Sequence, residues 1–359
     1  MAVAIVIPCL NEEGYIEAAA SSLGFGVSGV AAADDVFLFL IDNGSTDRTP
    51  AVMERIASAS RPGSVRILVE PERGFVPPRR RGAFAAADLA ADLGIAPEEL
   101  LILQADADTL YLPGYSQRMW EALAGRRGFL LEGAIRRSAE FDAAHPEYRA
   151  LERSIVDAME AAGVGDNEEV IVDDKACGYL LSDYVRWGGH FREQDRLGGT
   201  VHAETTRLFL RARLRYGAVK IRVNPAQAES SRRRIIEEPA LHFATSGFPR
   251  EDAWVKAWRE RHPTAWTVDE FARSIDHPDV REACFYRRAH ELALFALLPW
   301  VVGQAAGEPV PDDPRALHLL SMIPPLSVEE LAERPALALS AVLDAIDVFP
   351  DAFRGALER

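Results

Sequence analysis

The sequence predicts an α/β fold, with a mostly parallel central sheet flanked by helices and a C-terminal all-helical extension. Up to about residue 225, short apolar runs rich in β-branched residues alternate with stretches of helical periodicity, and polar loops separate them. Beyond residue 247 only helical patterns remain. Strands that alternate with helices pair in parallel through crossover connections, so a sheet covered by helices is the expected architecture.

Each expected strand of the first half is an apolar run that a polar loop ends. The runs are residues 2–7, 36–41, 65–69 and 101–105. Asn11 is the predicted N-cap of the helix after the first run, and a helix beginning near Gly82 is expected after the third. Because ligands bind at the carboxyl ends of parallel strands, the polar residues after these runs should converge there. These residues are Glu12, Asp42, Asp47, Arg79, Asp106 and Asp108.

The most informative loop holds Asp106 and Asp108, which flank a single alanine at the end of the fourth apolar run. Carboxylates with this spacing can reach a hard divalent cation directly or through its waters, and the cation can neutralise the phosphates of a ligand. A solvated acidic turn is the alternative for so short a motif taken by itself. Mg²⁺ or Mn²⁺ fits oxygen ligands of this kind.

After Asp108 the predicted elements continue with less regular spacing. Helices are expected from the stretch 111–115 through Leu123, over 146–162 and from about 202 to Gly217, and strands over 128–135 and 218–223. In the C-terminal region, predicted capping boxes begin at Thr267 and Ser327, and no long Gly/Ser linker precedes them. The apolar stripes of these helices predict a packed core, whereas an exposed stripe would serve a homodimer.

Composition limits the partners and the compartment. The net charge of −15 and the pI near 5.1 argue against nucleic acid or an anionic membrane as the main partner. The three cysteines, Cys9, Cys177 and Cys284, are widely spaced and odd in number, so neither a disulfide framework nor a zinc cluster is expected. No apolar run is long enough to span a bilayer, and the N-terminus does not look like a signal peptide. We therefore expect a cytoplasmic protein without a transmembrane segment.

Four motifs, in this order, resemble those of the family 2 glycosyltransferases, which have the GT-A nucleotide-diphospho-sugar transferase fold. They are Ile-Pro-Cys-Leu-Asn-Glu-Glu at 7–13, Asp-Asn-Gly-Ser-Thr-Asp at 42–47, Arg-Gly at 73–74 with Arg-Arg-Arg-Gly at 79–82, and Asp-Ala-Asp at 106–108. The resemblance covers roughly residues 2–225. It implies a GT-A catalytic domain over 1–235, with a nucleotide-binding half at 1–110 and an acceptor half at 111–235, and a helical extension over 236–359.

On the donor side the resemblance implies two groups of contacts. The nucleoside would be held by a pocket lined with Pro8, Asn11 and Glu12, by Asp42 on the base or ribose, and by the turn that Asp47 supports. The diphosphate would be held by Arg79, by Asp106 facing the ribose or metal, and by a Mn²⁺ or Mg²⁺ on Asp108. The chemistry agrees, because a nucleotide diphosphate leaving group needs its charge neutralised.

On the acceptor side the resemblance implies a general base at the start of the helix near residue 204. Inverting members begin this helix with an acidic pair, and here only Glu204 remains, because Thr205 follows it. A carboxylate in the first helical turn is favoured by the helix dipole, and a base near the sugar is what inversion requires. An ordinary helix-start acid is the alternative, and Asp173 and Asp174 are reserve candidates for the base.

Four further residues have expected roles that stay open at this point. Arg232 and Arg233 could contact the diphosphate or an anionic acceptor, or lie in a solvated turn. His242 could complete the metal shell or be a core histidine, and His202 could bind the acceptor or be structural.

The sequence therefore predicts a metal-dependent glycosyltransferase that moves a sugar from a nucleotide-diphosphate donor, with UDP favoured, to a hydroxyl acceptor. Inversion is favoured and rests on Glu204 alone. The nearest alternative is a retaining GT-A glycosyltransferase with a small anionic acceptor. A catalytically silent GT-A module that binds a nucleotide or a partner is the alternative from another class, motivated by the missing second acid.

Overall fold

The chain forms two units in the computed structural model, which describes residues 2–27, 31–123, 125–161, 170–194, 198–309 and 314–357. The first unit comprises Met1–Arg137, Val172–Arg192 and Glu204–Ser231. The second comprises Ser138–Ile171, Glu193–Ala203 and Arg232–Arg359. The chain passes from the first unit to the second for the last time between residues 231 and 232, whereas the expected domain boundary is at 235. The segments 138–171 and 193–203 group with the C-terminal helices.

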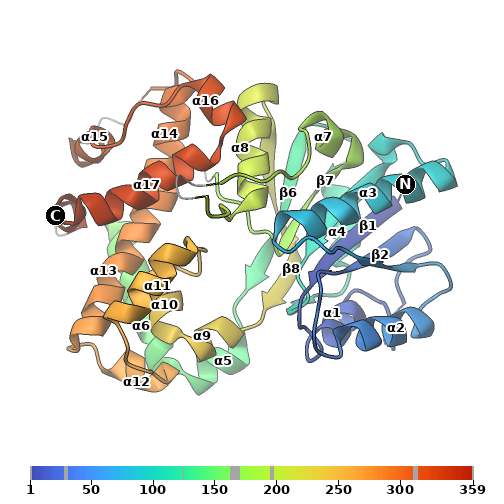
Figure 1. Ribbon diagram of the computed structural model, residues 1–359, viewed down its shortest axis with the longest axis horizontal. Coiled ribbons are helices and arrows are strands. Elements are labelled where there is room, and N and C mark those ends of the chain that lie inside the picture. Colours follow the sequence, from blue (N-terminus) through green and yellow to red (C-terminus); the bar gives the residue numbers. More distant parts are fainter. Residues whose placement is uncertain are drawn as a thin grey trace. The chain divides into compact units, whose positions relative to one another are not determined.

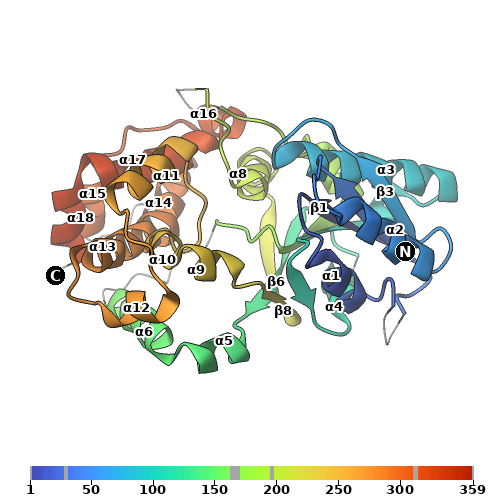
Figure 2. The ribbon, with the colours of Figure 1, turned by 60° about the horizontal axis from the view of Figure 1, so that its bottom comes forward.

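A mixed sheet is the centre of the first unit, and within the described residues it has eight strands in the order β3-β2-β1-β4-β7-β6-β8-β5 (Figure 1). The strands are β1 (Ala2–Cys9), β2 (Val36–Asp42), β3 (Val65–Val69), β4 (Leu100–Ala105), β5 (Thr109–Tyr111), β6 (Phe129–Arg136), β7 (Ala176–Leu180) and β8 (Val219–Ser230). From β3 to β4 neighbouring strands are parallel, β7 is antiparallel to β4 and β6, and β8 is parallel to β6 beside it (Figure 2) and antiparallel to β5. The predicted parallel half is confirmed, and β7 makes the whole sheet mixed.

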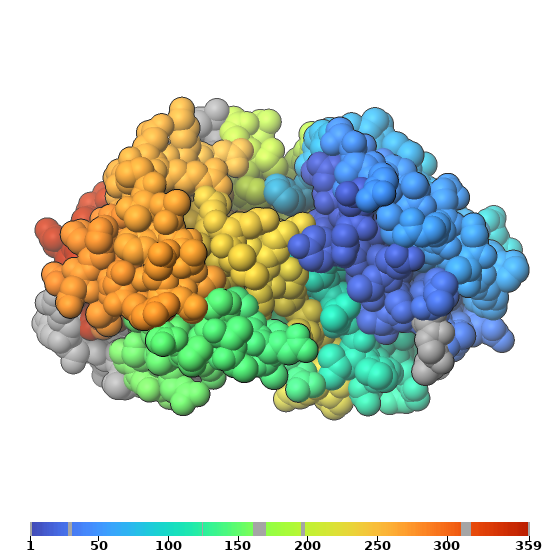
Figure 3. Space-filling model, turned by 90° about the horizontal axis from the view of Figure 1, so that it is seen from below, coloured from blue at the N-terminus to red at the C-terminus, as the bar shows by residue number. Residues whose placement is uncertain are grey.

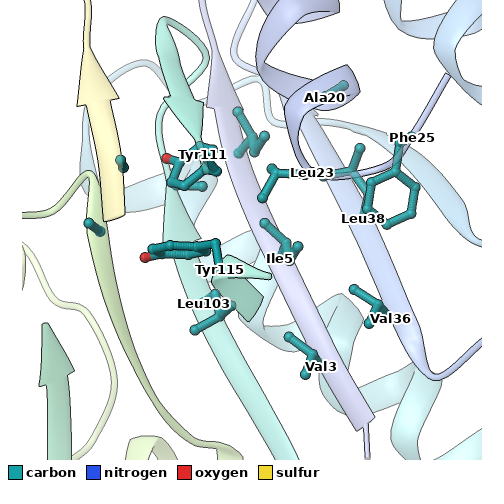
Figure 4. Packing of buried hydrophobic residues seen from close by; sticks show 14 of the residues in the cluster. Val3, Ile5, Ala20, Leu23, Phe25, Val36, Leu38, Leu103, Tyr111 and Tyr115 are labelled. Atoms are coloured by element: carbon teal, nitrogen blue, oxygen red, sulfur yellow. The ribbon is translucent and has the colours of Figure 1, made fainter. Parts of the chain in front are cut away.

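Helices cover both faces of this sheet because the strands are apolar on both sides. Along β1, Ile5 and Val6 belong to two different hydrophobic clusters, one on each face. The cluster of Ile5 includes residues of α1 (Ile16–Ser22), α2 (Thr49–Ala59) and α4 (Tyr115–Leu123), and part of it is drawn in Figure 4. The cluster of Val6 includes residues of α3 (Val76–Leu93), α7 (Leu181–Arg186) and α8 (Glu204–Tyr216). A short 3₁₀ helix, η1 (Pro97–Glu99), precedes β4.

Helix α3 begins earlier than the sequence predicts. Its first turn contains Pro77 and Pro78, which lack the amide hydrogens that a first turn leaves unpaired, so the helix starts at Val76. The expectation of a helix start near Gly82 is therefore wrong. Gly82 lies within the helix where it crosses β1, and a Cβ there would come within 2.3 Å of Val6 Cγ1. Gly82 is needed for close packing of helix on strand.

The second unit is helical in its described residues. Its helices are α5 (Ala139–Ala144), α6 (Pro146–Ala161), α9 (Arg233–Glu237), α10 (Pro239–Ala244), α11 (Asp252–Arg261), α12 (Val268–Arg273), α13 (Pro278–Leu292), the π-helical η2 (Ala293–Leu297), α14 (Leu298–Ala305), α15 (Pro314–Leu320), α16 (Val328–Glu333), α17 (Ala336–Val348) and α18 (Pro350–Leu357). The C-terminal helical region is thus confirmed, as are the capping boxes at Thr267 and Ser327. None of the described helices has the length and apolar character needed to cross a bilayer.

Aromatic packing explains why residues 138–171 belong to the helical unit. The buried ring of Tyr148 on α6 lies 5.8 Å from the ring of Phe243 and 6.3 Å from that of Phe271, between centroids. Helix α6 packs against α12 and α13, and Figure 3 shows the green surface of this segment continuous with the orange surface of those helices. Burial of these rings stabilises the packing of α6 against the C-terminal helices, although in the sequence α6 lies between two strands of the first unit.

Candidate functional site

Two loops at the carboxyl edge of β1 and β2 are tied together through Asn11. Its side-chain oxygen accepts a hydrogen bond from the main-chain amide of Thr46 at 2.8 Å, and its main-chain amide donates to Ser45 Oγ at 3.0 Å. Asn11 has a φ of 58°, a left-handed conformation that asparagine tolerates better than most residues. Helix α1 begins after Tyr15, so the prediction that Asn11 caps it is wrong. Asn11 instead connects the two loops.

Asp42 and Asp47 shape the second of these loops. Asp42, 8% exposed at the end of β2, accepts a hydrogen bond from the Ser45 amide at 3.0 Å. Asp47 accepts from the Thr49 amide at 2.9 Å and from the Glu13 amide at 3.2 Å. Asp47 thus holds this turn to the loop after β1, and the donor-binding roles of Asp42 and Asp47 stay predictions.

Pro8 and Glu12 lie at the same edge. Pro8 is the partner of Ile41 in the β1–β2 register and is half-buried, and Cys9 is paired with Asp42. The Glu12 amide donates to Thr49 Oγ1 at 2.7 Å. The predicted nucleoside-binding residues therefore share one edge of the sheet, as their positions after parallel strands require.

The turn after β4 presents Asp106 and Asp108. Both are half-buried, and Ala107 between them is buried. The turn is fixed by main-chain contacts, since the Thr109 amide donates to the Asp106 carbonyl at 3.4 Å and the Ser231 amide to the Asp108 carbonyl at 3.0 Å. Because β4 pairs with β1, this turn adjoins the loop that follows β1.

The two carboxylates of this turn can supply part of the ligand shell of a hard divalent cation. Among the described residues no group of three or more histidine, cysteine, aspartate or glutamate side chains could hold a metal ion. Two carboxylates alone suit Mg²⁺ or Mn²⁺, which keep several waters and take further oxygens from substrate phosphates. Asp106 and Asp108 would be the protein ligands.

Arg79 lies buried beneath this turn, 6% exposed, and its guanidinium makes three hydrogen bonds. Nε donates to Glu204 Oε1 at 2.9 Å, Nη1 to Gln104 Oε1 at 3.1 Å, and Nη2 to Asp106 Oδ1 at 3.1 Å. Burial lowers the pKa of Arg79, but the surrounding carboxylates, Asp106 first, outweigh it and hold the pKa well above its usual value. The arginine expected near a diphosphate is thus a charged counter-ion for the protein's own carboxylates, and a direct diphosphate contact stays a prediction.

Glu204 begins α8 as predicted, but it is only 4% exposed. Near it lies Asp174, whose pKa is raised to about 8, first by burial and then by the charge of Glu204. The Thr205 hydroxyl, hydrogen-bonded to Asp174, lowers that pKa in part, and it lies 3.1 Å from Nε2 of the buried His190. Burial also lowers the pKa of His190 well below its usual value, so this ring is neutral. Asp174 therefore keeps its proton at neutral pH.

The remaining predicted residues belong to the second unit. They are His202, Arg232 at the N-cap of α9, Arg233 as its first residue, and His242 in α10. Their roles at the metal, the diphosphate or the acceptor stay predictions.

Two residues of this region were missed by sequence reasoning. Gln104, fully buried, donates to the Tyr179 hydroxyl at 2.8 Å while it accepts from Arg79. A glutamine inside an otherwise apolar run was the signal for it. Tyr111, whose hydroxyl accepts from the Asp106 amide at 2.9 Å, had no such signal, because a tyrosine after a turn is unremarkable in sequence.

The sheet and the acidic turn define an α/β protein with a candidate ligand site at the carboxyl edge of β1, β2 and β4. The chain belongs to the glycosyl transferase family 2, whose family model matches residues 4–184. It is therefore a glycosyltransferase, and its fold is of the GT-A type, as predicted. Comparison with curated protein sequences gives no significant match.

Several solved glycosyltransferase structures resemble the chain at low sequence identity. TarS 1-349 of S. aureus in complex with UDP-GlcNAc is 12% identical, with a TM-score of 0.49 over 99% of this chain and 92% of that one. Mannosyltransferase PcManGT of Pyrobaculum calidifontis, in complex with GDP-Man and Mn²⁺, is 14% identical, with a TM-score of 0.48 over 97% and 87%. Glucosyl-3-phosphoglycerate synthase of Mycobacterium tuberculosis, in complex with phosphoglyceric acid, is 18% identical, with a TM-score of 0.37 over 69% and 81%.

Proposed function

We propose that the protein transfers a sugar from a nucleotide-diphosphate donor, with UDP favoured, to a hydroxyl acceptor, and that a divalent cation assists the transfer. The observation that carries the proposal is the pair Asp106 and Asp108 at the end of β4, beside the loop that follows β1. The cation would be Mn²⁺ or Mg²⁺, and when bound it would neutralise the charge that develops on the departing diphosphate.

The chain's own residues would bind and orient the donor. Pro8, Asn11 and Glu12 would line the nucleoside pocket and Asp42 would hydrogen-bond the base or ribose. Support comes from the hydrogen bonds of Asn11 and Asp47, which hold the loop after β1 to the loop after β2. Such preorganisation reduces the ordering cost of binding.

We infer that Glu204 positions Arg79 and is not the general base. A base must reach the acceptor hydroxyl at hydrogen-bond distance. Glu204 already accepts from Arg79 Nε at 2.9 Å, and its side chain is 4% exposed. This ion pair is the observation that favours the second candidate, a retaining transfer, in which an acceptor-activating carboxylate on the opposite face of the sugar is not required.

Two experiments test the proposal. Purified protein incubated with UDP- and GDP-linked sugars and Mn²⁺ should release the nucleoside diphosphate, by transfer or by slow hydrolysis, and chelation of the metal should stop the release. Intact nucleotide binding without release from any donor would support the silent binding module. The anomeric configuration of the product, read by NMR, separates the two courses, since an inverted product would contradict the second candidate.

Homodimerisation through the helical unit, contacts of Arg232 or Arg233 with an anionic acceptor, and a metal role for His242 stay predictions. Sedimentation of the purified chain and metal titration of His242→Ala address the first and the last of these.

A further inference from the structure

The hydroxyl of Tyr111 connects the residue that follows β4 to the residue that precedes β7. It accepts a hydrogen bond from the Asp106 amide at 2.9 Å and donates one to the Lys175 carbonyl at 2.7 Å. Tyr111 is 2% exposed, and its own amide donates to Ser22 Oγ at 2.9 Å.

The strand register shows what this hydroxyl replaces. The last pair of the antiparallel β4–β7 ladder joins Ala105 with Ala176. The next pair would be Asp106 with Lys175, and these are the residues whose amide and carbonyl the phenol oxygen bridges. A hydroxyl therefore occupies the place of a direct rung, and the two strands part where the acidic turn begins.

Asp106 is consequently held from two directions. Tyr111 fixes its main chain, and Arg79 Nη2 binds its carboxylate at 3.1 Å. On the other side of the bridge, Lys175 Nζ lies 2.8 Å from Asp173 Oδ1. The single phenol thus joins the acidic turn to the segment that precedes β7.

We propose that Tyr111 is a positioning residue that sets the main-chain orientation of Asp106, and with it the spacing of the Asp106 and Asp108 carboxylates, for a divalent cation and a nucleotide diphosphate. This inference rests on the proposed function. Groups that orient metal ligands without touching the metal commonly change metal affinity or activity by about 10- to 100-fold when removed.

Tyr115 provides a matched control. Its ring is equally buried at 2% exposed, and its centroid is 4.8 Å from that of Tyr111 in the same cluster (Figure 4). Among the described residues its hydroxyl has no hydrogen-bond partner. Tyr111→Phe and Tyr115→Phe therefore delete the same atom from neighbouring rings, and only the first deletion breaks the bridge.

The test is a titration of the full chain with Mn²⁺ in the presence of UDP, at a temperature well below unfolding. Calorimetry and the spin-resonance signal of free Mn²⁺ measure the binding. We expect Tyr111→Phe to raise the Mn²⁺ dissociation constant about tenfold and Tyr115→Phe to leave it within about twofold. Equal Mn²⁺ affinity in Tyr111→Phe and wild type, even with a lowered melting temperature, would overturn the positioning role and leave the proposed function standing. Absence of Mn²⁺-dependent UDP binding in the wild type would overturn both.

A second measurement needs no variant. Amide hydrogen exchange of the ligand-free wild type should protect Asp106 as strongly as Ala105, the last residue of β4, because the phenol accepts from the Asp106 amide. Exchange of Asp106 at the rate of an open turn would overturn the inference, whether or not Tyr111→Phe folds.

Discussion

The guanidinium of Arg79 and the carboxylate of Glu204 form a buried ion pair, with Nε and Oε1 2.9 Å apart and side chains 7% and 4% exposed. The two residues are 125 positions apart in the chain, and their contact joins α3 to the start of α8 beneath the end of β4. A cation buried with carboxylates in this way fixes them in place, and removal of either partner leaves an uncompensated charge.

Arg79→Met should lower the free energy of unfolding by about 3–5 kcal/mol, because Glu204 and Asp106 would lose their shared counter-ion. Urea unfolding measures the change. Arg81→Met, an exposed position two residues further along α3, is the control and should stay within about 0.5 kcal/mol of wild type. Equal loss in the two variants would show that the buried pair contributes nothing specific.

Glu204→Gln keeps an amide oxygen that can accept from Arg79 but removes the charge. We expect the rate of sugar transfer or donor hydrolysis to fall by less than about tenfold, together with a lower melting temperature, because a positioning role is only weakened. Steady-state kinetics with measured UDP affinity decide the matter. A loss of roughly 10² or more in kcat, with UDP binding and stability unchanged, would restore Glu204 as the general base.

The raised pKa of Asp174, about 8, predicts a slope in stability with pH. The folded state holds a proton that the unfolded state, with a carboxyl pKa near 3.8, releases, so this group's contribution to stability falls as pH rises from about 4 to about 8 and is level above that. Asp174→Asn should flatten this part of the profile, measured by urea unfolding at several pH values. Asp173→Asn, whose carboxylate pairs with Lys175, should keep the slope; a slope unchanged in Asp174→Asn would refute the assignment.

Residues 1–246 expressed alone should not give a stable protein. The fragment keeps α6 but loses α12 and α13, against which α6 packs, and it loses the buried Phe271 that lies beside Tyr148 and Phe243. Exposure of these rings removes several kcal/mol, a large part of a typical domain stability of about 5–15 kcal/mol. Solubility and thermal unfolding are the readouts. A soluble fragment that melts cooperatively and binds UDP as the full chain does would contradict this.

The sequence was a good guide wherever local pattern decides the structure. The strand at Val65–Val69 and the helix that starts at Tyr115 follow directly from apolar periodicity, and the edge that gathers Asp42, Asp106 and Asp108 follows from parallel pairing. Pattern was insufficient where two distant segments meet. Nothing near Arg79 in the sequence indicates that its partner is Glu204. Reasoning from sequence alone therefore assigned the charge of Arg79 to the diphosphate of a ligand.

The same limit explains two other differences. The assignment of α6 to the helical unit depends on rings of Phe243 and Phe271, which lie far along the chain from Tyr148. The bridge through Tyr111 depends on the antiparallel register of β7 against β4, a pairing that apolar runs alone do not reveal. Tertiary contacts, and not local propensity, set these features.

The most direct test of the central claim is calorimetry of UDP binding with and without Mn²⁺, in the wild type and in Asp108→Asn. If Asp106 and Asp108 hold the cation, Mn²⁺ should tighten UDP binding by the wild type, and Asp108→Asn should lose about 1–3 kcal/mol of that metal-dependent affinity while it unfolds as the wild type does. Asp88→Asn, which removes an exposed carboxylate on α3, should bind as the wild type does. UDP binding that is indifferent to Mn²⁺ in the wild type, or metal-dependent binding that survives intact in Asp108→Asn, would contradict the account.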